Sequence, residues 1–280
     1  MLGAVAGDII GSPYVRNSDD INMDFPLFSE KSKNTEITVM TLAVSEALMH
    51  VMPVYGEINF TEERFARELI FWMQMFGRKF AKKVHYGKKF FRWINSSKPL
   101  PYESLSNGPA LRVSPVAWAF DNIEDVERFA EISARLTSTT DESVLYAQVM
   151  AGAVFLARMK RDKEDIQTYF HEKTGLIPKT FDELRSDFYF MTTCKETVSA
   201  ALSVFLESEN FEDAVRKSVL LGGETNATAA MSGAVSEAFS GIKILTEVEA
   251  FERLEKRLKF SVEKWEQWIS LEAANKNNNL

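Results

Sequence analysis

Oxygen-bearing side chains gather at the start of two predicted helices that lie far apart in the sequence. The first group is Thr35 and Glu36, and the second is Glu224, Thr225 and Asn226. Such side chains cap the free backbone N–H groups of a helix, or they bind a hard cation such as Mg²⁺ through oxygen. Capping accounts well for Thr225 and Asn226 but less well for Glu224. If the two helix starts meet in the fold, these residues would form one cation site.

A third segment, residues 3–12, is rich in small residues and carries one carboxylate, Asp8. Three glycines at Gly3, Gly7 and Gly11 each cost a helix interior about 1 kcal/mol relative to alanine. A compensating role is therefore expected, and the two candidates are close packing of helix backbones and close approach of a ligand. Small helix faces mostly serve contact between helices, which favours packing.

The elements that must position these residues are helices. Apolar residues recur with helical spacing along most of the chain, and we find neither alternating strand patterns nor a fixed-period repeat. We therefore predict an all-α protein that forms one domain over residues 1–280, with a frayed tail at 275–280. After the small-residue helix, helices are predicted over residues 35–51, 61–76, 122–136, 141–159, 163–175, 195–207, 210–221, 225–240, 247–257 and 260–270.

Two long segments, residues 12–34 and 77–108, are polar and poor in helical pattern. Long ordered loops inside a compact helical domain often bind ligands, so we predict that both segments help to form a binding site. The alternative is that they are surface excursions without a binding role.

Composition limits the kinds of partner. The chain has 280 residues, of which 45% are hydrophobic and 26% charged, as in ordinary globular proteins. Its net charge of −7 argues against a general surface for nucleic acid or an anionic membrane, but leaves room for a local pocket for one phosphorylated ligand. A single cysteine, Cys194, excludes an intrachain disulfide and predicts a reducing cytoplasm. No run approaches the roughly 18 apolar residues of a membrane span.

Several motifs, taken in order, resemble the ADP-ribosylglycohydrolase family in its bacterial branch related to dinitrogenase-reductase-activating glycohydrolase. The opening "GAVAGDIIGS" at residues 3–12 is similar to the family's first helix. "TEITVMTLA" at residues 35–43 stands where the family carries "TDDTxMTLA", and "GGETNATAA" at residues 222–230 stands where it carries "GGDTDTxAA". Between them, "YGKKFFRW" at residues 86–93 and "NGPALRVSPVAW" at residues 107–118 are similar to family segments.

The resemblance implies hydrolysis of the bond between the anomeric carbon of ADP-ribose and an acceptor side chain. It also implies two magnesium ions, which need several anionic oxygens around them because the ions repel each other. By the same resemblance, the ligand-binding residues are Tyr86, Gly87, Asn107, Gly108 and Arg112. For Arg112, a structural role in satisfying loop carbonyls is an equal alternative.

The metal-binding positions depart from the family pattern. Thr35 is kept, Glu36 replaces the first aspartate of "TDDT", and Ile37 replaces the second. In the C-terminal motif, Glu224 replaces one aspartate and Asn226 replaces the other. Four carboxylates are thus reduced to two, both longer than the originals, and octahedral magnesium tolerates misplaced ligands poorly.

Other expected groups are replaced as well. Ala227 stands where a hydroxyl is common, and Val15 stands where some members carry a glutamate. Residues 137–143 lack the histidines that many members have there. The catalytic residue stays unassigned, with Asp8 and Glu36 as the candidates.

We therefore predict a divergent member that binds ADP-ribose or a related nucleotide with little or no hydrolysis, with an ADP-ribosylated protein as a further partner. The first alternative is an active hydrolase with a reduced site, in which Thr35, Glu36, Glu224 and Asn226 hold a single Mg²⁺. The second alternative is an interaction protein that keeps only the fold. On these readings the site holds one magnesium ion or none.

Overall fold

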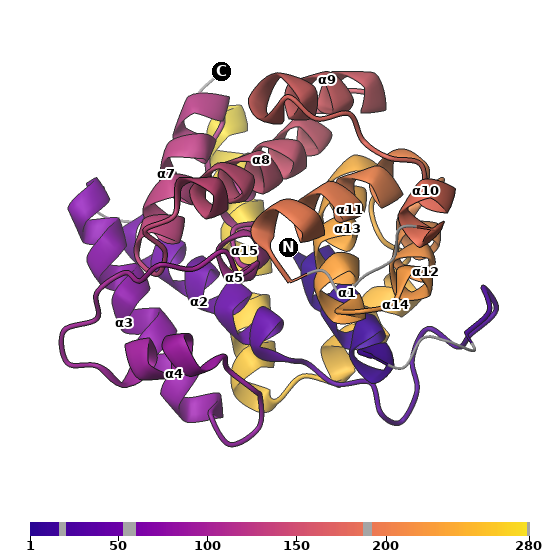
Figure 1. The fold of residues 1–280 in the computed structure, drawn as a ribbon. Helices are drawn as coiled ribbons and strands as arrows, with labels where there is room; N and C mark the ends of the chain where they lie inside the picture. The colour runs from indigo at the N-terminus through magenta and orange to yellow at the C-terminus, as the bar shows by residue number, and fades with distance from the viewer. Residues whose placement is uncertain (17–20, 53–59, 187–191, 279–280) are drawn as a thin grey trace.

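The computed structural model describes residues 1–16, 21–52, 60–186 and 192–278. In these ranges the chain folds into helices joined by loops (Figure 1). Within these ranges there is no strand, only two isolated bridges that pair Tyr102 with Ser138 and Ser106 with Thr193. The all-α prediction is confirmed. The elements are α1 (Leu2–Gly11), η1 (Ser12–Tyr14), α2 (Glu36–Val51), α3 (Glu62–Phe80), α4 (Lys88–Asn95), α5 (Gly108–Leu111), α6 (Val116–Ala119), α7 (Ile123–Arg135), α8 (Asp141–Arg158), α9 (Lys163–Thr174), α10 (Phe181–Ser186), α11 (Cys194–Leu206), α12 (Phe211–Leu221), α13 (Thr225–Ser240), α14 (Ile244–Glu252) and α15 (Lys256–Asn278).

Polar caps define where several helices begin. The side chain of Thr61 accepts a hydrogen bond from a backbone N–H in the first turn of α3, and Asn122 does the same for α7. At α11, Thr193 and Glu196 form a reciprocal capping box. Each cap satisfies an N–H that has no partner inside its own helix, so the sequence alone was enough to place these starts.

Helices α1 and α13 lie side by side at the centre of the molecule (Figure 1). A Cβ atom on Gly7 would lie 2.1 Å from the backbone oxygen of Ala229, and one on Gly3 would lie 2.2 Å from the backbone oxygen of Gly233. Only glycine permits this approach, so the small-residue face of α1 serves helix packing. The same packing brings the C-terminal end of α1 next to the first turn of α13.

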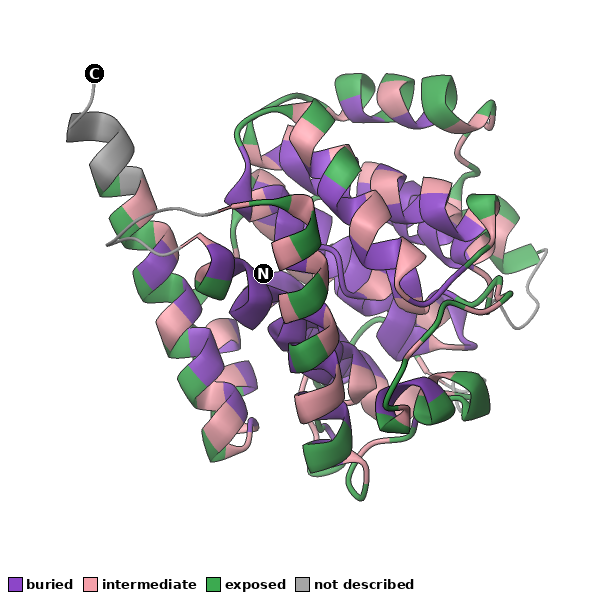
Figure 2. Ribbon diagram, turned by 90° about the vertical axis from the view of Figure 1, so that its left-hand side faces the viewer, coloured by how far each residue is buried: buried purple, intermediate pink, exposed green. Residues whose placement is uncertain are grey.

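The hydrophobic core extends from Met1 to Trp268 and draws on almost every helix. Figure 2 shows that the central helices are buried along most of their length, whereas outer helices alternate between buried and exposed turns. Among the described residues, no helix combines the length and the apolar character that crossing a membrane would require.

Two boundary predictions are wrong. The segment 77–108 is not a continuous loop, because α3 runs on to Phe80 and α4 adds two more turns whose Trp93 and Ile94 are buried. At the C-terminus, the break between the last two helices falls at residues 253–255 instead of 258–259. Helix α15 then continues through 275–278, where a frayed tail was predicted, and residues 279–280 lie outside the described ranges.

Candidate active site at the starts of helices α2 and α13

The N-terminal ends of α2 and α13 meet beside the C-terminal end of α1. The Thr225 hydroxyl donates to the backbone oxygen of Gly11 over 2.7 Å. The Asn226 side-chain amide donates to the Thr35 hydroxyl over 3.3 Å. The two oxygen-rich helix starts, 191 residues apart, are therefore brought together by the packing of α1 on α13.

Asp8 is fully buried at this junction, and its carboxylate accepts four hydrogen bonds. Oδ1 accepts from the Thr35 hydroxyl over 2.6 Å, and Oδ2 accepts from the backbone N–H of Thr35 over 2.8 Å. Oδ2 also accepts from the hydroxyl of Thr38 over 2.6 Å and from its backbone N–H over 3.2 Å. Three of these donors bond to Oδ2 and one bonds to Oδ1, and together they fix the start of α2 to α1.

Burial raises the pKa of Asp8, while the four donated hydrogen bonds oppose that rise. The four hydrogen bonds hold this fully buried carboxylate against the start of α2. Asp8 is thus placed as a structural anchor of the site. Thr38, which sequence reasoning did not single out, is its second partner.

The Thr35 hydroxyl is also fully occupied. It donates to Asp8, and it accepts from the backbone N–H of Ile37 over 3.2 Å and from the amide of Asn226. A hydroxyl offers one donor and two acceptor positions, so none is left for a cation in this arrangement. Thr35 caps α2, and capping is one of the two roles that the sequence left open for this residue.

An apolar contact joins the two helix starts at the positions that depart from the metal-binding pattern. Ile37 packs against Ala227 and Ala230, with the half-buried Leu111 beside them, in a cluster separate from the main core. The resemblance implies a carboxylate at the first of these positions and a hydroxyl at the second. A side chain that could bind a cation is replaced on both facing helices by one that cannot.

Glu36 and Glu224 supply the negative charge that remains. Burial raises the pKa of Glu36 to about 7, and the nearby carboxylates of Asp8 and Glu224 add to that rise. Burial also raises the pKa of Glu224, although the Asn107 amide, which donates to Glu224 Oε2 over 2.9 Å, and the charge of Arg16 lower it. The charges of Asp8 and Glu224 therefore act on Glu36, and burial disfavours the ionised form of all three carboxylates.

These residues do not fit a two-magnesium centre. Within the described part of the chain, no three His, Cys, Asp or Glu side chains are grouped so that they could hold a metal ion. The hydroxyl of Thr35 and the carboxylate of Asp8 are committed to each other, and Ile37 and Ala227 occupy two ligand positions with carbon. The charge available to a cation is that of Glu36 and Glu224.

Tyr86 and Gly87 lie between α3 and α4, close to this junction. The Tyr86 side chain is buried, and its hydroxyl has no hydrogen-bond partner among the described residues. Burial, with the charge of Glu36, raises the pKa of that hydroxyl, which places the two side chains near each other. Gly87 precedes α4, and a Cβ atom there would meet nothing within 4 Å, so its backbone borders open space.

Asn107 is the residue that precedes α5, and Gly108 is the first residue of that helix. The Asn107 amide donates to Glu224 and, over 3.3 Å, to the Thr197 hydroxyl. Its side chain therefore links the loop before α5 to both the start of α13 and α11.

Arg112 is buried, and its guanidinium bonds to protein groups around it. It donates to the backbone oxygen of Ser133 over 2.6 Å, to the hydroxyl of Thr137 over 2.8 Å and to the backbone oxygen of Gly108 over 3.3 Å. Burial lowers the pKa of Arg112 to about 10. Of the two alternatives for this residue, the contacts match the structural one.

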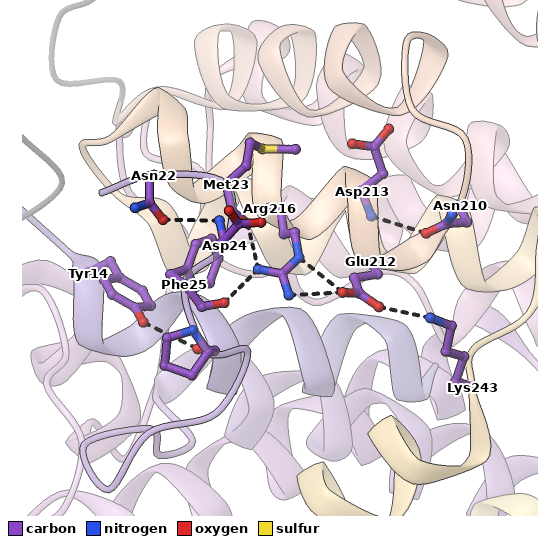
Figure 3. A network of polar contacts seen from close by, with 11 residues as sticks. Tyr14, Asn22, Met23, Asp24, Phe25, Asn210, Glu212, Asp213, Arg216 and Lys243 are labelled. Carbon is purple, nitrogen blue, oxygen red and sulfur yellow. Dashed lines mark hydrogen bonds and ion pairs between the residues drawn. The ribbon is translucent and has the colours of Figure 1, made fainter. Parts of the chain in front are cut away.

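The segment between η1 and α2 is fastened to α12 by Arg216, a residue that sequence reasoning missed (Figure 3). Its guanidinium donates to the backbone oxygens of Met23 and Phe25 over 2.7 and 2.6 Å, and it lies over the Phe25 ring. Glu212 orients the same group over 2.9 Å. Arg216 gave no signal in sequence, because its partners are backbone oxygens about 190 residues away.

The same segment passes the candidate site at Val15 and Arg16. Arg16 has a positive φ of 63°, and its backbone N–H donates to the oxygen of Gly223 over 3.0 Å. This contact holds the end of η1 against the turn that precedes Glu224. Residues 17–20 of the predicted loop lie outside the described ranges.

Comparisons with known proteins agree on one group. A family model described as ADP-ribosylglycohydrolase matches residues 1–273. A curated Archaeoglobus fulgidus protein, named only as uncharacterized, is 23% identical over 272 residues, covering 85% of each chain. ADP-ribosylhydrolase ARH3 of Bos taurus is 24% identical over 190 residues, 51% of this chain and 52% of that protein. A chain of an "ADP-ribosylglycohydrolase-related protein complex" has the same fold, with a TM-score of 0.66, 20% identity and coverage of 96% and 94%.

Proposed function

This chain belongs to the ADP-ribosylglycohydrolase family, and we propose that it binds ADP-ribose or a related nucleotide with little or no hydrolysis. The observation that carries the proposal is the contact of Ile37 with Ala227, which puts carbon where the resemblance implies an aspartate and a hydroxyl. Drift without a change of role would scatter replacements over the surface. Here they face each other across one junction.

The surroundings of the junction support ligand binding. Tyr86 holds a buried hydroxyl that has no partner among the described residues, an arrangement that costs about 1–3 kcal/mol and that an oxygen of a bound nucleotide would relieve. Gly87 offers backbone that a diphosphate could approach closely. These features favour retention of a binding site by a family member that has lost part of its chemistry.

The same junction is poorly equipped for hydrolysis. Cleavage of the glycosidic bond requires an activated water and stabilisation of an oxocarbenium-like transition state. Asp8 is fully buried and is engaged by four hydrogen bonds that anchor α2, and the Thr35 hydroxyl is committed to Asp8. Glu36 is the remaining candidate base, and a raised pKa of about 7 leaves it partly protonated at neutral pH.

Calorimetry with ADP-ribose tests the proposal. We expect saturable binding whose Kd changes by less than about threefold between magnesium and EDTA, because the site does not depend on two cations. Tyr86→Phe should weaken binding about fivefold, the loss of one neutral hydrogen bond, whereas Tyr169→Phe on α9 should leave it unchanged. Absence of binding to ADP-ribose under either condition would overturn the proposal.

A second candidate function is hydrolysis with a single cation. It is favoured by the charges of Asp8 and Glu224, which contribute to the raised pKa of Glu36, since carboxylates that repel one another attract a divalent ion. In this case Glu36 and Glu224 would hold the ion, with Asn226 as a neutral ligand, and the ion would supply Lewis-acid chemistry.

Release of ADP-ribose from peptides modified on arginine or serine separates the two candidates. The binding proposal expects release at the uncatalysed rate. Magnesium-dependent release that is lost in Glu36→Ala/Glu224→Ala, but kept in the α9 control Glu164→Ala/Glu172→Ala, would establish the hydrolase instead. The cytoplasmic location inferred from Cys194 stays a prediction alongside either candidate.

A further inference from the structure

A strongly basic stretch of the sequence lies between the starts of α2 and α13, the two helix starts that form the candidate site. Residues 69–102 contain no Asp or Glu, although the whole chain has 40 acidic against 33 basic residues. The same stretch carries the basic residues Arg78, Lys79, Lys82, Lys83, Lys88, Lys89, Arg92 and Lys98. Positive charge is therefore concentrated over the end of α3, the whole of α4 and the connection between them.

Three of these side chains have structural partners. Arg78 donates to the backbone oxygen of Ile94 over 2.7 Å, and Lys89 donates to that of Glu103 over the same distance. Lys83 pairs with Glu255 over 2.6 Å. The others are exposed, and their side chains form no ion pair or hydrogen bond within the described part of the chain. We call this set the basic strip: Lys79, Lys82, Lys88, Arg92 and Lys98.

The basic strip borders the candidate site. Lys89 bonds to the backbone oxygen of Glu103, in the segment that leads to Asn107, and the buried Tyr86 lies within the basic stretch itself. Burial, with the charge of Glu36, raises the pKa of Tyr86. Two large apolar side chains stand exposed among the lysines, with Phe91 46% and Leu100 74% accessible. Uncompensated charge mixed with exposed apolar groups is typical of a surface that meets a macromolecular partner.

We propose that the basic strip docks an acidic surface of the protein that presents ADP-ribose to the site; this inference rests on the proposed function. Complementary charge would steer such a partner and fix its orientation. The composition of the strip favours protein over nucleic acid. Four of its five cations are lysines, which lack the planar fork that reads bases and phosphates, and of the two exposed apolar side chains Phe91 could stack on a base but Leu100 could not.

Three synthetic 20-residue peptides test the proposal, each with one central ADP-ribosyl-arginine and with flanks rich in Glu, in Gln or in Lys. At low salt we expect affinity to fall in that order, with about tenfold between the Glu and Gln peptides. The preference should shrink in 0.5 M NaCl, where exposed charges are screened. Free ADP-ribose and the unmodified Glu peptide are measured in parallel.

Charge-reversal variants test whether the basic strip is the source of the preference for the Glu-rich peptide. Lys82→Glu/Arg92→Glu should abolish the difference between the Glu and Gln peptides and leave the affinity for free ADP-ribose unchanged. The matched control Lys195→Glu/Lys256→Glu reverses two exposed, unpaired lysines on α11 and α15 and carries the same change in net charge. It should keep most of the preference.

Every outcome decides the matter. Equal affinity for the three modified peptides would overturn the docking surface while leaving ADP-ribose binding intact. Preference for the Glu peptide without any gain from the ADP-ribosyl group would keep the surface but overturn the proposed function. Tighter binding of the oligonucleotide dT20 than of the Glu peptide, lost in Lys82→Glu/Arg92→Glu, would show that the strip serves nucleic acid and overturn the proposal.

Discussion

Helix α2 buries a glutamate near each of its ends, and the two side chains have opposite surroundings. Near the C-terminal end, Glu46 is 1% exposed and is bound by Lys264 over 2.7 Å, Arg257 over 3.1 Å and the Ser261 hydroxyl over 2.7 Å. At the N-terminal end, Glu36 is half-buried beside other carboxylates, and its pKa is raised to about 7.

The contrast separates structure from function within one helix. Both cations around Glu46 come from α15, so this cluster fastens the last helix to the core and needs nothing from outside. The charge at Glu36 destabilises the fold unless something else compensates for it. A chain keeps such a group where a ligand, a cation or a proton compensates for it.

Removal of Asp8, which anchors the N-terminal end of α2, should have the largest effect on stability. Asp8→Ala leaves two backbone N–H groups and two hydroxyls of α2 without their acceptor, so we expect a loss of about 3–5 kcal/mol in the free energy of unfolding. Asp8→Asn keeps the shape and part of the hydrogen bonding and should lose less. Urea denaturation at pH 7 measures both. A loss below about 1 kcal/mol for Asp8→Ala would show that the anchor is dispensable.

Removing the charge at each end of α2 should change stability in opposite directions. Glu46→Gln leaves Arg257 and Lys264 without their partner, and we expect a loss of about 2 kcal/mol at pH 8. Glu36→Gln removes an unfavourable charge, and we expect a gain of about 2–3 kcal/mol at the same pH in EDTA. Thermal and urea unfolding of both variants measure the pair, and the same sign for both would contradict the comparison.

The gain from Glu36→Gln should depend on pH in one direction. A folded-state pKa of about 7, above the ordinary 4.5, means that the folded protein holds a proton which the unfolded chain releases first. Below pH 4.5 both states are protonated and the variant should match the wild type. From there to pH 7 the stability of the wild type falls relative to the variant, and above pH 7 the difference is constant. A difference that is flat from pH 4 to 8 would contradict the raised pKa.

A smaller change in stability should follow from restoring carboxylates at the starts of α2 and α13. Ile37→Asp/Asn226→Asp restores two carboxylates next to Glu36 and Glu224, and without a cation it should be less stable than the wild type. In 10 mM Mg²⁺ the double variant should recover about 1–2 kcal/mol by mass action, and the wild type should recover less. Equal stabilisation of the two proteins by Mg²⁺ would show that Ile37 and Asn226 are not what limits cation binding.

Much of this protein follows from its sequence alone, because the determinants are local. Helical spacing, the caps at Thr61 and Asn122 and the three glycines of α1 act over a few residues, and they predict the helices and the close packing of α1. The replaced ligands at Ile37 and Ala227 could also be read from the motifs. Boundaries failed where packing outweighs local pattern, as in α4, whose Trp93 and Ile94 are held by the core.

Only the tertiary structure decided what these residues do. Ile37 meets Ala227 across 190 positions of sequence, Asp8 accepts hydrogen bonds from groups about 30 residues away, and Glu46 binds cations more than 200 residues further on. Whether a carboxylate is an anchor, a compensated ion or an uncompensated, half-buried site charge depends on these distant neighbours. The physical reason is that burial and Coulomb interactions depend on distance in space, which the spacing of residues along the chain does not determine.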